Sequence, residues 1–292
     1  MARIDVRKTY KLYIGGAFPR SESGYSYEVL DAKGAFVANA SLASRKDARD
    51  AVVAARKAFG GWSGRTAYNR GQVLYRIAEV MEDRRPQFVE AVKQGEGLTA
   101  ARAGAVVDAA VDRLVWYAGW ADKLAQVVGN ANPVAGPFFN LSSPEPTGVV
   151  AVLAPQASSL LGLVSAVAPV IVSGNTAVVV SSFERPLPAV TFAEVLATSD
   201  VPGGVVNLLT GSASTLGPWL ASHMDVNAID LLGVAGLSGG AELATELEVA
   251  AADNLKRVRR APAAEPDFTE AQGLEAMTAF LETKTVWHPM GV

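Results

Sequence analysis

Four short apolar runs rich in β-branched residues constrain the fold of this 292-residue chain more than any other feature. They read GVVAVLA, TAVVV, VVNLL and AIDLL, at residues 148–154, 176–180, 205–209 and 228–232. Nearly continuous apolar runs of this length are typical of strands that are buried on both faces. Helix-like stretches follow them at 160–172, 187–196, 214–222 and 237–255. The alternation predicts an α/β fold, a Rossmann-like doubly wound parallel sheet with helices on both faces.

The part of the chain before these runs predicts a β layer followed by helices. Short alternating strands with glycine turns begin at Lys11, and Ser44 with Asp47 matches a capping box at the start of a helix. The apolar stripes of the following helices are explained by core packing. These helices are expected at 68–92, with a break near Pro86, and at 101–124, so that residues 1–128 form the N-terminal part of a cofactor-type domain.

Shifts in composition set the remaining boundaries. Asn, Pro, Gly and Ser surround Phe138 and Phe139, which favours an extended oligomerisation arm over more packed core. A basic, then proline-punctuated stretch begins at Lys256, and we interpret it as a solvated linker. The assignments are the arm at 129–147, the parallel sheet region at 148–258, and the linker, a short helix (274–280) and a terminal strand within 259–292.

Charge and hydropathy exclude two classes of partner. The 26 Lys and Arg residues against 29 Asp and Glu residues offer no excess positive charge to a phosphate backbone, so nucleic acid is not expected. The uncharged stretch 146–183 is interrupted by proline, glycine and polar residues, so no membrane span is expected. The N-terminus carries basic residues with no apolar stretch behind them, which indicates a cytoplasmic protein.

The residue types that carry most chemistry are scarce. The chain has no cysteine, which excludes disulfides, thiolate metal sites and a thiol nucleophile from this chain. Its two histidines, His223 and His288, lack the spacing of paired metal ligands, and no neighbours complete a catalytic triad. We therefore expect no metal site. The glycine-rich turn from Gly233 to Gly239 leads into a helix and is either a plain tight turn or an unusual phosphate site.

The order of segments resembles the NAD(P)-dependent aldehyde dehydrogenase superfamily over almost the whole chain. The similar segments include LYIGGAF near the N-terminus, WYAGWADKL at 116–124, SGNTAVVV at 173–180, VPGGVVNLLTG at 201–211 and LETKTVW at 281–287. The resemblance implies that chemistry requires a cysteine nucleophile, an asparagine that supports the oxyanion and a glutamate that activates water.

None of these three groups is present at the matching positions. Ala157 stands at the asparagine position, and Arg259 to Pro262 replace the turn that carries the glutamate. The chain then passes almost directly to its tail, so the resemblance implies that the catalytic domain is missing. This pattern is similar to the silent C-terminal half of family 16 aldehyde dehydrogenases, and we assign no catalytic residue.

The cofactor site of the resembling family is also altered. Val180 and Phe183 replace a lysine and a glutamate that hold the adenosine ribose. Loss of two charge-assisted hydrogen bonds predicts that NAD or NADP binds weakly and that no cofactor binds tightly. The positions that remain as a vestigial cofactor site are Pro155, Ser182, Gly211 and Gly233.

The resemblance leads to a main hypothesis and two alternatives. The main hypothesis is a pseudoenzyme that forms a hetero-oligomer with a full-length aldehyde dehydrogenase, as its structural or regulatory subunit. The alternatives are an NAD(P)-dependent aldehyde oxidoreductase that works only in complex with a partner, and a nucleotide- or metabolite-binding module. The residues expected to contact the partner are Phe138, Phe139, Lys284, Val286 and Trp287.

Overall fold

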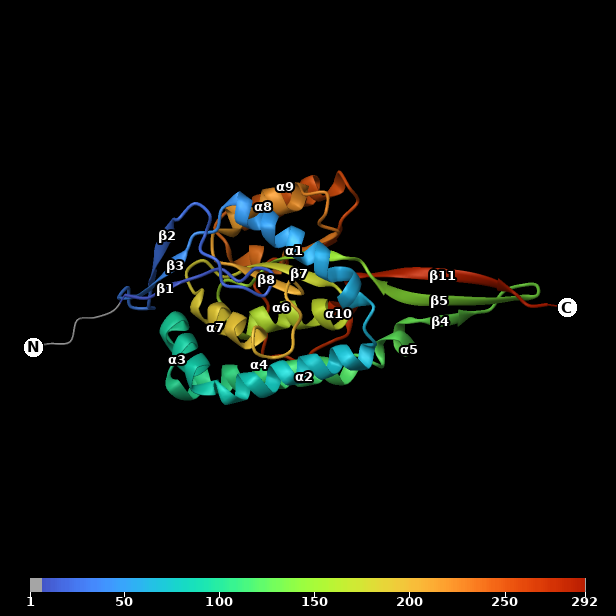
Figure 1. The fold of residues 1–292 in the computed structure, drawn as a ribbon, viewed down its shortest axis with the longest axis horizontal. Helices are drawn as coiled ribbons and strands as arrows, with labels where there is room; N and C mark the ends of the chain where they lie inside the picture. Colours follow the sequence, from blue (N-terminus) through green and yellow to red (C-terminus); the bar gives the residue numbers. More distant parts are fainter. Residues whose placement is uncertain (1–6, 292) are drawn as a thin grey trace, which may run out of the picture.

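A computed structural model describes residues 7–291 and has a five-stranded parallel sheet at its centre (Figure 1). The order of strands is β10-β9-β6-β7-β8, and every neighbouring pair is parallel. The strands are β6 (Val149–Leu153), β7 (Thr176–Val180), β8 (Val206–Leu209), β9 (Ala228–Asp230) and β10 (Arg257–Arg259). The prediction of a Rossmann-like α/β fold is confirmed.

The strands supply two hydrophobic cores because successive side chains point to opposite faces. In β6, Val149, Ala151 and Leu153 enter one core, whereas Val150 and Val152 enter the other. One face is covered by three helices and the other by two (Figure 1). The first set is α1 (Arg45–Ser63), α8 (Ala213–Ser222) and α9 (Gly240–Ala252), and the second is α6 (Leu161–Val172) and α7 (Leu187–Leu196).

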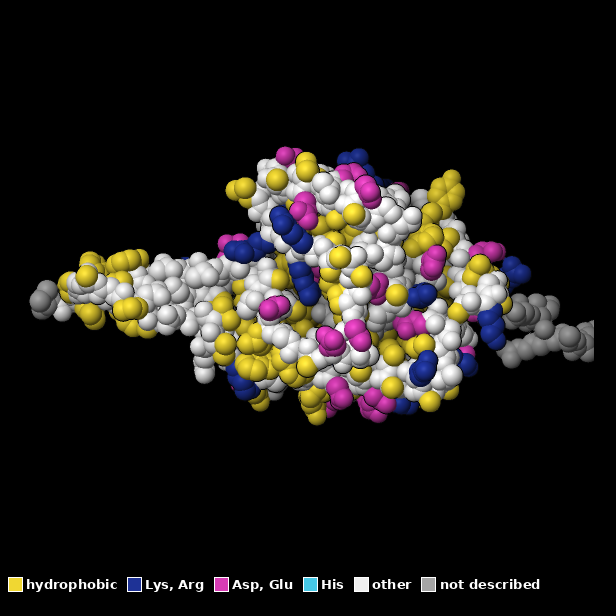
Figure 2. Space-filling view, turned by 180° about the vertical axis from the view of Figure 1, so that it is seen from behind, with side chains coloured by type: hydrophobic (Ala, Val, Ile, Leu, Met, Phe, Trp, Pro, Cys, Tyr) yellow, Lys and Arg dark blue, Asp and Glu magenta, His cyan; other side chains and the backbone are white. Residues whose placement is uncertain are grey.

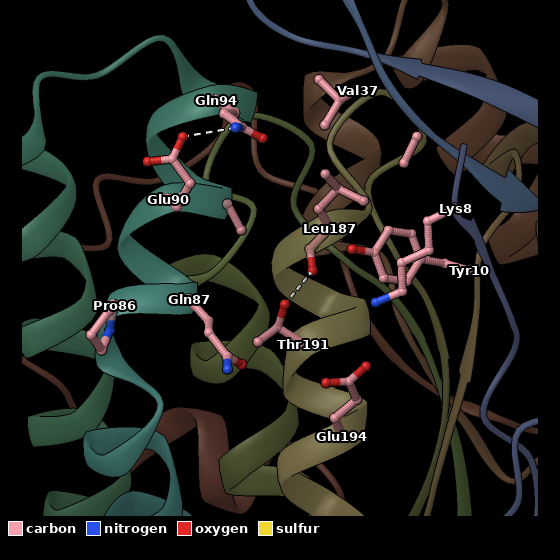
Figure 3. A pocket seen from close by; sticks show the side chains of 12 residues that line it. Lys8, Tyr10, Val37, Pro86, Gln87, Glu90, Gln94, Leu187, Thr191 and Glu194 are labelled. Atoms are coloured by element: carbon pink, nitrogen blue, oxygen red, sulfur yellow. Dashed lines mark hydrogen bonds between the residues drawn. The ribbon is translucent and has the colours of Figure 1, made fainter. Parts of the chain in front are cut away.

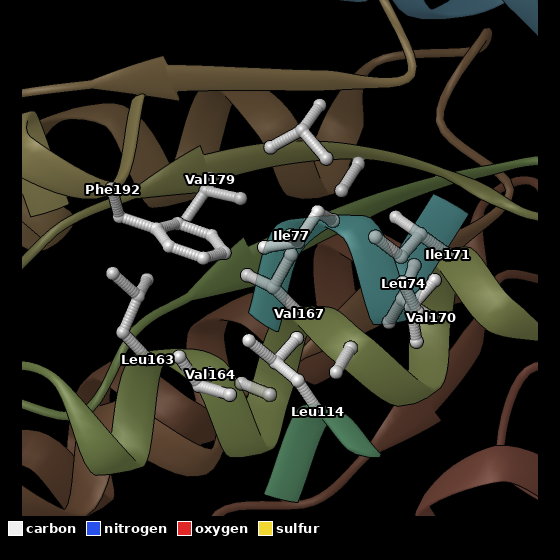
Figure 4. Close-up of a cluster of buried hydrophobic side chains, with 14 of the residues drawn as sticks. Leu74, Ile77, Leu114, Leu163, Val164, Val167, Val170, Ile171, Val179 and Phe192 are labelled. Atoms are coloured by element: carbon white, nitrogen blue, oxygen red, sulfur yellow. The ribbon is translucent and has the colours of Figure 1, made fainter. Parts of the chain in front are cut away.

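A further layer of helices packs outside α6 and α7. The layer is built from α2 (Ala67–Asp83), α3 (Arg85–Glu96), α4 (Ala100–Trp120) and α5 (Leu124–Val128). Leu74 and Ile77 of α2 and Leu114 of α4 pack with Val167 of α6 in a cluster of buried hydrophobic side chains (Figure 4). The expected break before Pro86 is present, since α2 ends at Asp83 and α3 begins at Arg85.

The N-terminal β layer is a small separate sheet beside the central one. It contains β1 (Thr9–Tyr10), β2 (Ser26–Leu30) and β3 (Phe36–Ser41), in the order β1-β3-β2. The capping box of α1 is confirmed, because the Ser44 amide donates to Asp47 Oδ2 at 2.8 Å and the Asp47 amide donates to Ser44 Oγ at 3.3 Å.

The sequence interpretation was wrong at two places near the end of the sheet. The basic run begins with a strand, β10, which pairs with β9 and crosses the boundary placed at 258. Its alternating Arg-Val-Arg pattern suits an edge strand, where charged side chains reach solvent. A 3₁₀ helix (Leu232–Gly236) precedes α9, which therefore begins at Gly240, after the expected start.

The arm is a third sheet that projects from the amino end of β6 (Figure 1). It consists of β4 (Asn130–Asn132), β5 (Phe138–Pro146) and β11 (Leu281–Pro289), and the short helix α10 (Glu275–Thr278) precedes β11. The pairing of β11 with β5 is antiparallel and continuous from Leu281 opposite Pro146 to Pro289 opposite Phe138. Among residues 7–291, no helix is long and apolar enough to cross a membrane.

Candidate functional site

The carboxyl ends of the parallel strands bring three of the four predicted cofactor residues together. Ser182, after β7, donates from Oγ to the Gln156 carbonyl at 3.0 Å, directly after Pro155 at the end of β6. Gly233, after β9, packs so closely that a Cβ atom there would lie 2.0 Å from the Ala154 oxygen. Gly211, after β8, lies apart from these three, against Ala43 and Leu216.

The loop after β6 forms an anion-binding nest of consecutive backbone N–H groups, and Glu265 fills it. The amides of Gln156 and Ser158 donate to different oxygens of the Glu265 carboxylate, at 3.0 and 2.8 Å. The Ala157 amide lies 3.1 Å from both oxygens. Nests of this kind bind anions because several N–H dipoles converge on one point. Here the anion comes from the chain itself.

Two charged residues hold this loop from its other sides. Arg185 donates from Nη1 to the Ala157 carbonyl at 2.8 Å. The Glu96 carboxylate at the end of α3 accepts from the Ser159 amide at 2.8 Å and from its Oγ at 2.7 Å. Burial raises the pKa of Glu96, while the hydrogen bonds from Ser159 oppose this shift. Loop 155–159 is thus held by three charged residues from three distant segments.

The linker is fastened to the helical layer by Arg113 of α4. This buried guanidinium donates to the Phe268 carbonyl at 2.6 Å and the Glu270 carbonyl at 3.2 Å, and it also contacts Ser165 Oγ. One turn further along α4, the Tyr117 hydroxyl lies 3.2 Å from Gln272 Oε1, and burial raises the pKa of Tyr117 to about 12. The linker is therefore attached to the domain through Phe268, Glu270 and Gln272, while most of its residues are exposed, as expected of a solvated segment.

A buried ion pair joins the ends of β9 and β10. Asp230 is fully buried, accepts from the Leu232 amide at 2.9 Å and pairs with Arg259 Nη1 at 3.1 Å. Burial raises the pKa of Asp230, and Arg259 opposes this shift. The Arg259 side chain is 28% exposed, so the cation of this pair is partly in contact with solvent while its carboxylate is not.

As arranged, these strand ends do not fit a dinucleotide. Ser182 is hydrogen-bonded to the loop after β6, Gly233 contacts backbone, and the nest is filled by Glu265. Phe183 stacks on Tyr27, with ring centroids 4.5 Å apart. Ser182, Gly233, Phe183 and the nest are thus each in contact with another part of the chain, and we derive no chemical step through a cofactor.

Away from the strand ends, a hollow lies between the N-terminal sheet and helices α3 and α7 (Figure 3). Its lining mixes Lys8 and Tyr10 with Glu90, Gln94 and Glu194, without converging on one point. Glu90 already binds Gln94 at 2.7 Å, and Glu194 pairs with Arg84 at 3.1 Å. Within the described part of the chain, no group of three or more His, Cys, Asp or Glu residues is placed to hold a metal ion.

The five predicted partner residues all lie on the arm. Phe138 and Trp287 meet edge to face near its tip, with ring centroids 5.7 Å apart, and Lys284 pairs with Glu145 at 3.1 Å. Phe139, Val286 and Trp287 are 46–58% exposed. Figure 2 shows hydrophobic side chains gathered around the end of the arm. Among residues 7–291, no strand pairs with the outer edge of β11.

Sequence reasoning missed Glu265, Arg113 and the Asp230–Arg259 pair. Arg113 left a signal, because it is a charge within the otherwise apolar stripe of α4 that includes Ala110, Leu114 and Tyr117. Glu265 left none, since its partners are backbone groups more than a hundred residues earlier. Asp230 stood inside an apolar run, where a buried carboxylate implies a partner.

Comparisons with known proteins agree with this architecture. The chain is 34% identical over 263 residues to cytosolic 10-formyltetrahydrofolate dehydrogenase from Pongo abelii, covering 87% of the chain and 28% of that protein. It is 31% identical to aldehyde dehydrogenase, cytosolic 1, from Elephantulus edwardii, covering 88% and 51%. The crystal structure of HpcC from Thermus thermophilus superimposes with a TM-score of 0.79 at 28% identity, over 86% of this chain and 47% of that one.

The chain therefore spans about half the length, or less, of the relatives that it matches. The model of the aldehyde dehydrogenase family matches residues 19–259, which include the whole central sheet and end immediately before the segment that carries Glu265. On this match and the shared fold, the chain belongs to the aldehyde dehydrogenase family.

Proposed function

We propose that this chain is a non-catalytic member of the family that acts as a structural or regulatory subunit of a full-length aldehyde dehydrogenase. The arm is the observation that carries the proposal. It presents the outer edge of β11, to which no described strand is paired, together with exposed Phe139, Val286 and Trp287. The chain that bears this arm has no cysteine.

The edge of β11 has the features of a strand-addition site. A nine-residue strand with free backbone groups on one side can accept or extend another sheet. Its exposed apolar side chains would leave water on association, which contributes about 25 cal/mol per Å² of apolar area. Two of its charged side chains, Glu282 and Lys284, already have partners within the chain, Arg257 and Glu145.

A different chain is a better partner than a second copy. The resemblance to the family implies that the strand acceptor belongs to the catalytic domain, and this chain matches only about half of its relatives. A pair of identical chains would then lack the catalytic-domain acceptor that the resemblance implies. We therefore propose a hetero-oligomer. The relatives named as cytosolic support a cytoplasmic location for it.

The arrangement at the strand ends supports the proposal of a subunit without catalytic activity. Ala157 cannot donate a side-chain hydrogen bond to an oxyanion, and its amide is used by Glu265. No thiol is supplied by this chain. Because the predicted cofactor positions Ser182 and Gly233 make contacts within the chain, we expect NAD and NADP to bind weakly.

Co-expression with full-length aldehyde dehydrogenases of the same organism tests the proposal. Capture through a tag on this chain, followed by native mass measurement, should recover a stoichiometric complex with a cysteine-containing subunit. Val286→Asp and Trp287→Asp should weaken recovery at least about tenfold, because a charge would enter the new interface. Tyr75→Asp is the matched control, since Tyr75 is 51% exposed on α2, away from the arm.

Two outcomes would contradict the proposal. The first is elution of the chain without a partner. The second is equal recovery of the Val286→Asp and Tyr75→Asp variants, which would show that the arm is not the interface. Calorimetric titration of the purified chain with NAD and NADP tests the silent site separately. Binding tighter than millimolar would favour an NAD(P)-dependent oxidoreductase that works with its partner.

A further inference from the structure

The nest after β6 is built to hold a planar carboxylate. Three consecutive N–H groups contact two oxygens, with Gln156 on one oxygen, Ser158 on the other and Ala157 between them. A carboxylate presents two coplanar oxygens in this way, so the donors match its shape. Three charge-assisted hydrogen bonds to one group are each stronger than bonds between neutral groups.

Other residues shape the cradle around this carboxylate. A Cβ atom at Gly236 would lie 2.7 Å from Glu265 Oε2, so the absence of a side chain there leaves room for the anion. Arg185 holds the opposite, carbonyl side of the loop. The loop leads into α6, whose N-terminus adds a favourable field for an anion. The Glu96 carboxylate accepts from the next amide, that of Ser159, and would repel a second negative charge on a ligand. The site therefore favours a singly charged ligand.

The segment that supplies Glu265 is lightly attached. From Ala261 to Pro266, no backbone N–H or C=O makes a hydrogen bond within residues 7–291, and the Glu265 side chain makes the polar contacts of the segment. Firm attachment resumes at Phe268, which is buried and bound by Arg113. The stretch 261–266 can therefore leave the loop without breaking the central sheet or the Arg113 contacts.

We propose that the nest of Gln156, Ala157 and Ser158 is a carboxylate-binding site that Glu265 keeps filled, and that a ligand carrying a single carboxylate enters when residues 261–266 lift away. Glu265 acts as a tethered competitor with an effective concentration of about millimolar or more. An added carboxylate then reaches the site of the unmodified chain only above that concentration. This inference does not depend on the arm, which lies at the opposite end of β6.

Chemical rescue by acetate tests the proposal. In Glu265→Ala, amide hydrogen exchange at Gln156, Ala157 and Ser158 should quicken about tenfold to a hundredfold, because three charge-assisted bonds are lost. Acetate should restore the protection, whereas chloride at the same ionic strength should not. Glu270→Gln removes another linker carboxylate, whose neighbours bind its backbone carbonyl and not its side chain, and it should leave exchange unchanged.

A second variant displaces the carboxylate without removing it. Gly236→Ala places a methyl group 2.7 Å from the position of Glu265 Oε2, too close for the carboxylate to stay, so exchange at the three amides should quicken and acetate should fail to restore the protection. Slow exchange at amides of β6 and β7 shows that each variant is folded. Unchanged protection of the three amides in folded Glu265→Ala, or equal effects of acetate and chloride on them, would overturn the proposal.

Discussion

The central sheet and the arm sheet differ in what surrounds them. Every residue of β6 and β7 is buried, whereas eight of the nine residues of β11 are exposed. The central sheet is covered by helices on both faces, whereas the arm sheet projects beyond the helices (Figure 1). The first sheet therefore supplies stability through apolar burial, and the second offers surface and a free edge for association.

The two ends of strand β6 show the same contrast on a smaller scale. Its amino end continues from β5 of the arm, which reaches into solvent. Its carboxyl end enters the loop that Glu265 closes. One strand thus links the arm, whose outer edge pairs with no strand among residues 7–291, to a site that Glu265 fills.

The largest expected difference comes from placing the same charge in each sheet. Val179→Asp buries a carboxylate in β7, where the side chain is fully buried, and should cost more than about 4 kcal/mol or prevent folding. Val286→Asp in β11, at 46% exposure, should change the free energy of unfolding by less than about 0.5 kcal/mol. Urea unfolding followed by circular dichroism measures both. Similar costs would show that the arm is as tightly packed as the centre.

Breaking the buried ion pair should have the next largest effect. Arg259→Met leaves the fully buried Asp230 without its cation and should cost about 3 kcal/mol. The double variant with Asp230→Asn should recover part of this loss, because it removes the uncompensated charge. Urea unfolding of the single and double variants checks the coupling, and strict additivity would argue against it.

Asp230 should also make stability depend on pH. Because burial raises its pKa above the ordinary value of 3.8, the folded chain binds this proton more tightly than the unfolded chain. The cost of ionising Asp230 is absent below about pH 3.8, grows as pH rises and levels off above the folded pKa. As the pH rises from about 3.8 to the folded pKa of Asp230, the unmodified chain should therefore lose stability relative to Asp230→Asn. Parallel stability curves for the two proteins would contradict the assignment.

The exposed ion pair of the arm should matter least. Lys284 and Glu145 lie 3.1 Å apart but are 60% and 50% exposed, so solvent and salt screen their attraction. Lys284→Met should change the free energy of unfolding by less than about 0.5 kcal/mol, and added salt should reduce the change further. A loss of stability comparable with that of Arg259→Met would show that solvent exposure does not determine how much these ion pairs contribute.

The fold was largely predictable because its signals are local. The runs at β6 and β7, the capping box at Ser44 and the break before Arg85 each depend on neighbouring residues. Strand β10 was missed because an alternating pattern of only three residues, two of them arginines, is too short to predict a strand. It forms because β9 offers an edge for pairing and Asp230 offers a partner for Arg259.

By itself, the sequence determined the layered α/β architecture, because periodicity records which faces of each element are buried. Its composition determined the absence of a thiol, and the order of its segments carried the family resemblance. The sequence also placed Pro155, Ser182 and Gly233 at strand ends that parallel pairing brings together. Only the tertiary structure decided that Glu265 fills the nest and that β11 pairs with β5 of its own arm. Every non-proline residue has a backbone N–H group, and every unpaired strand edge can form a ladder. No side-chain pattern therefore predicts which distant segment will bind them.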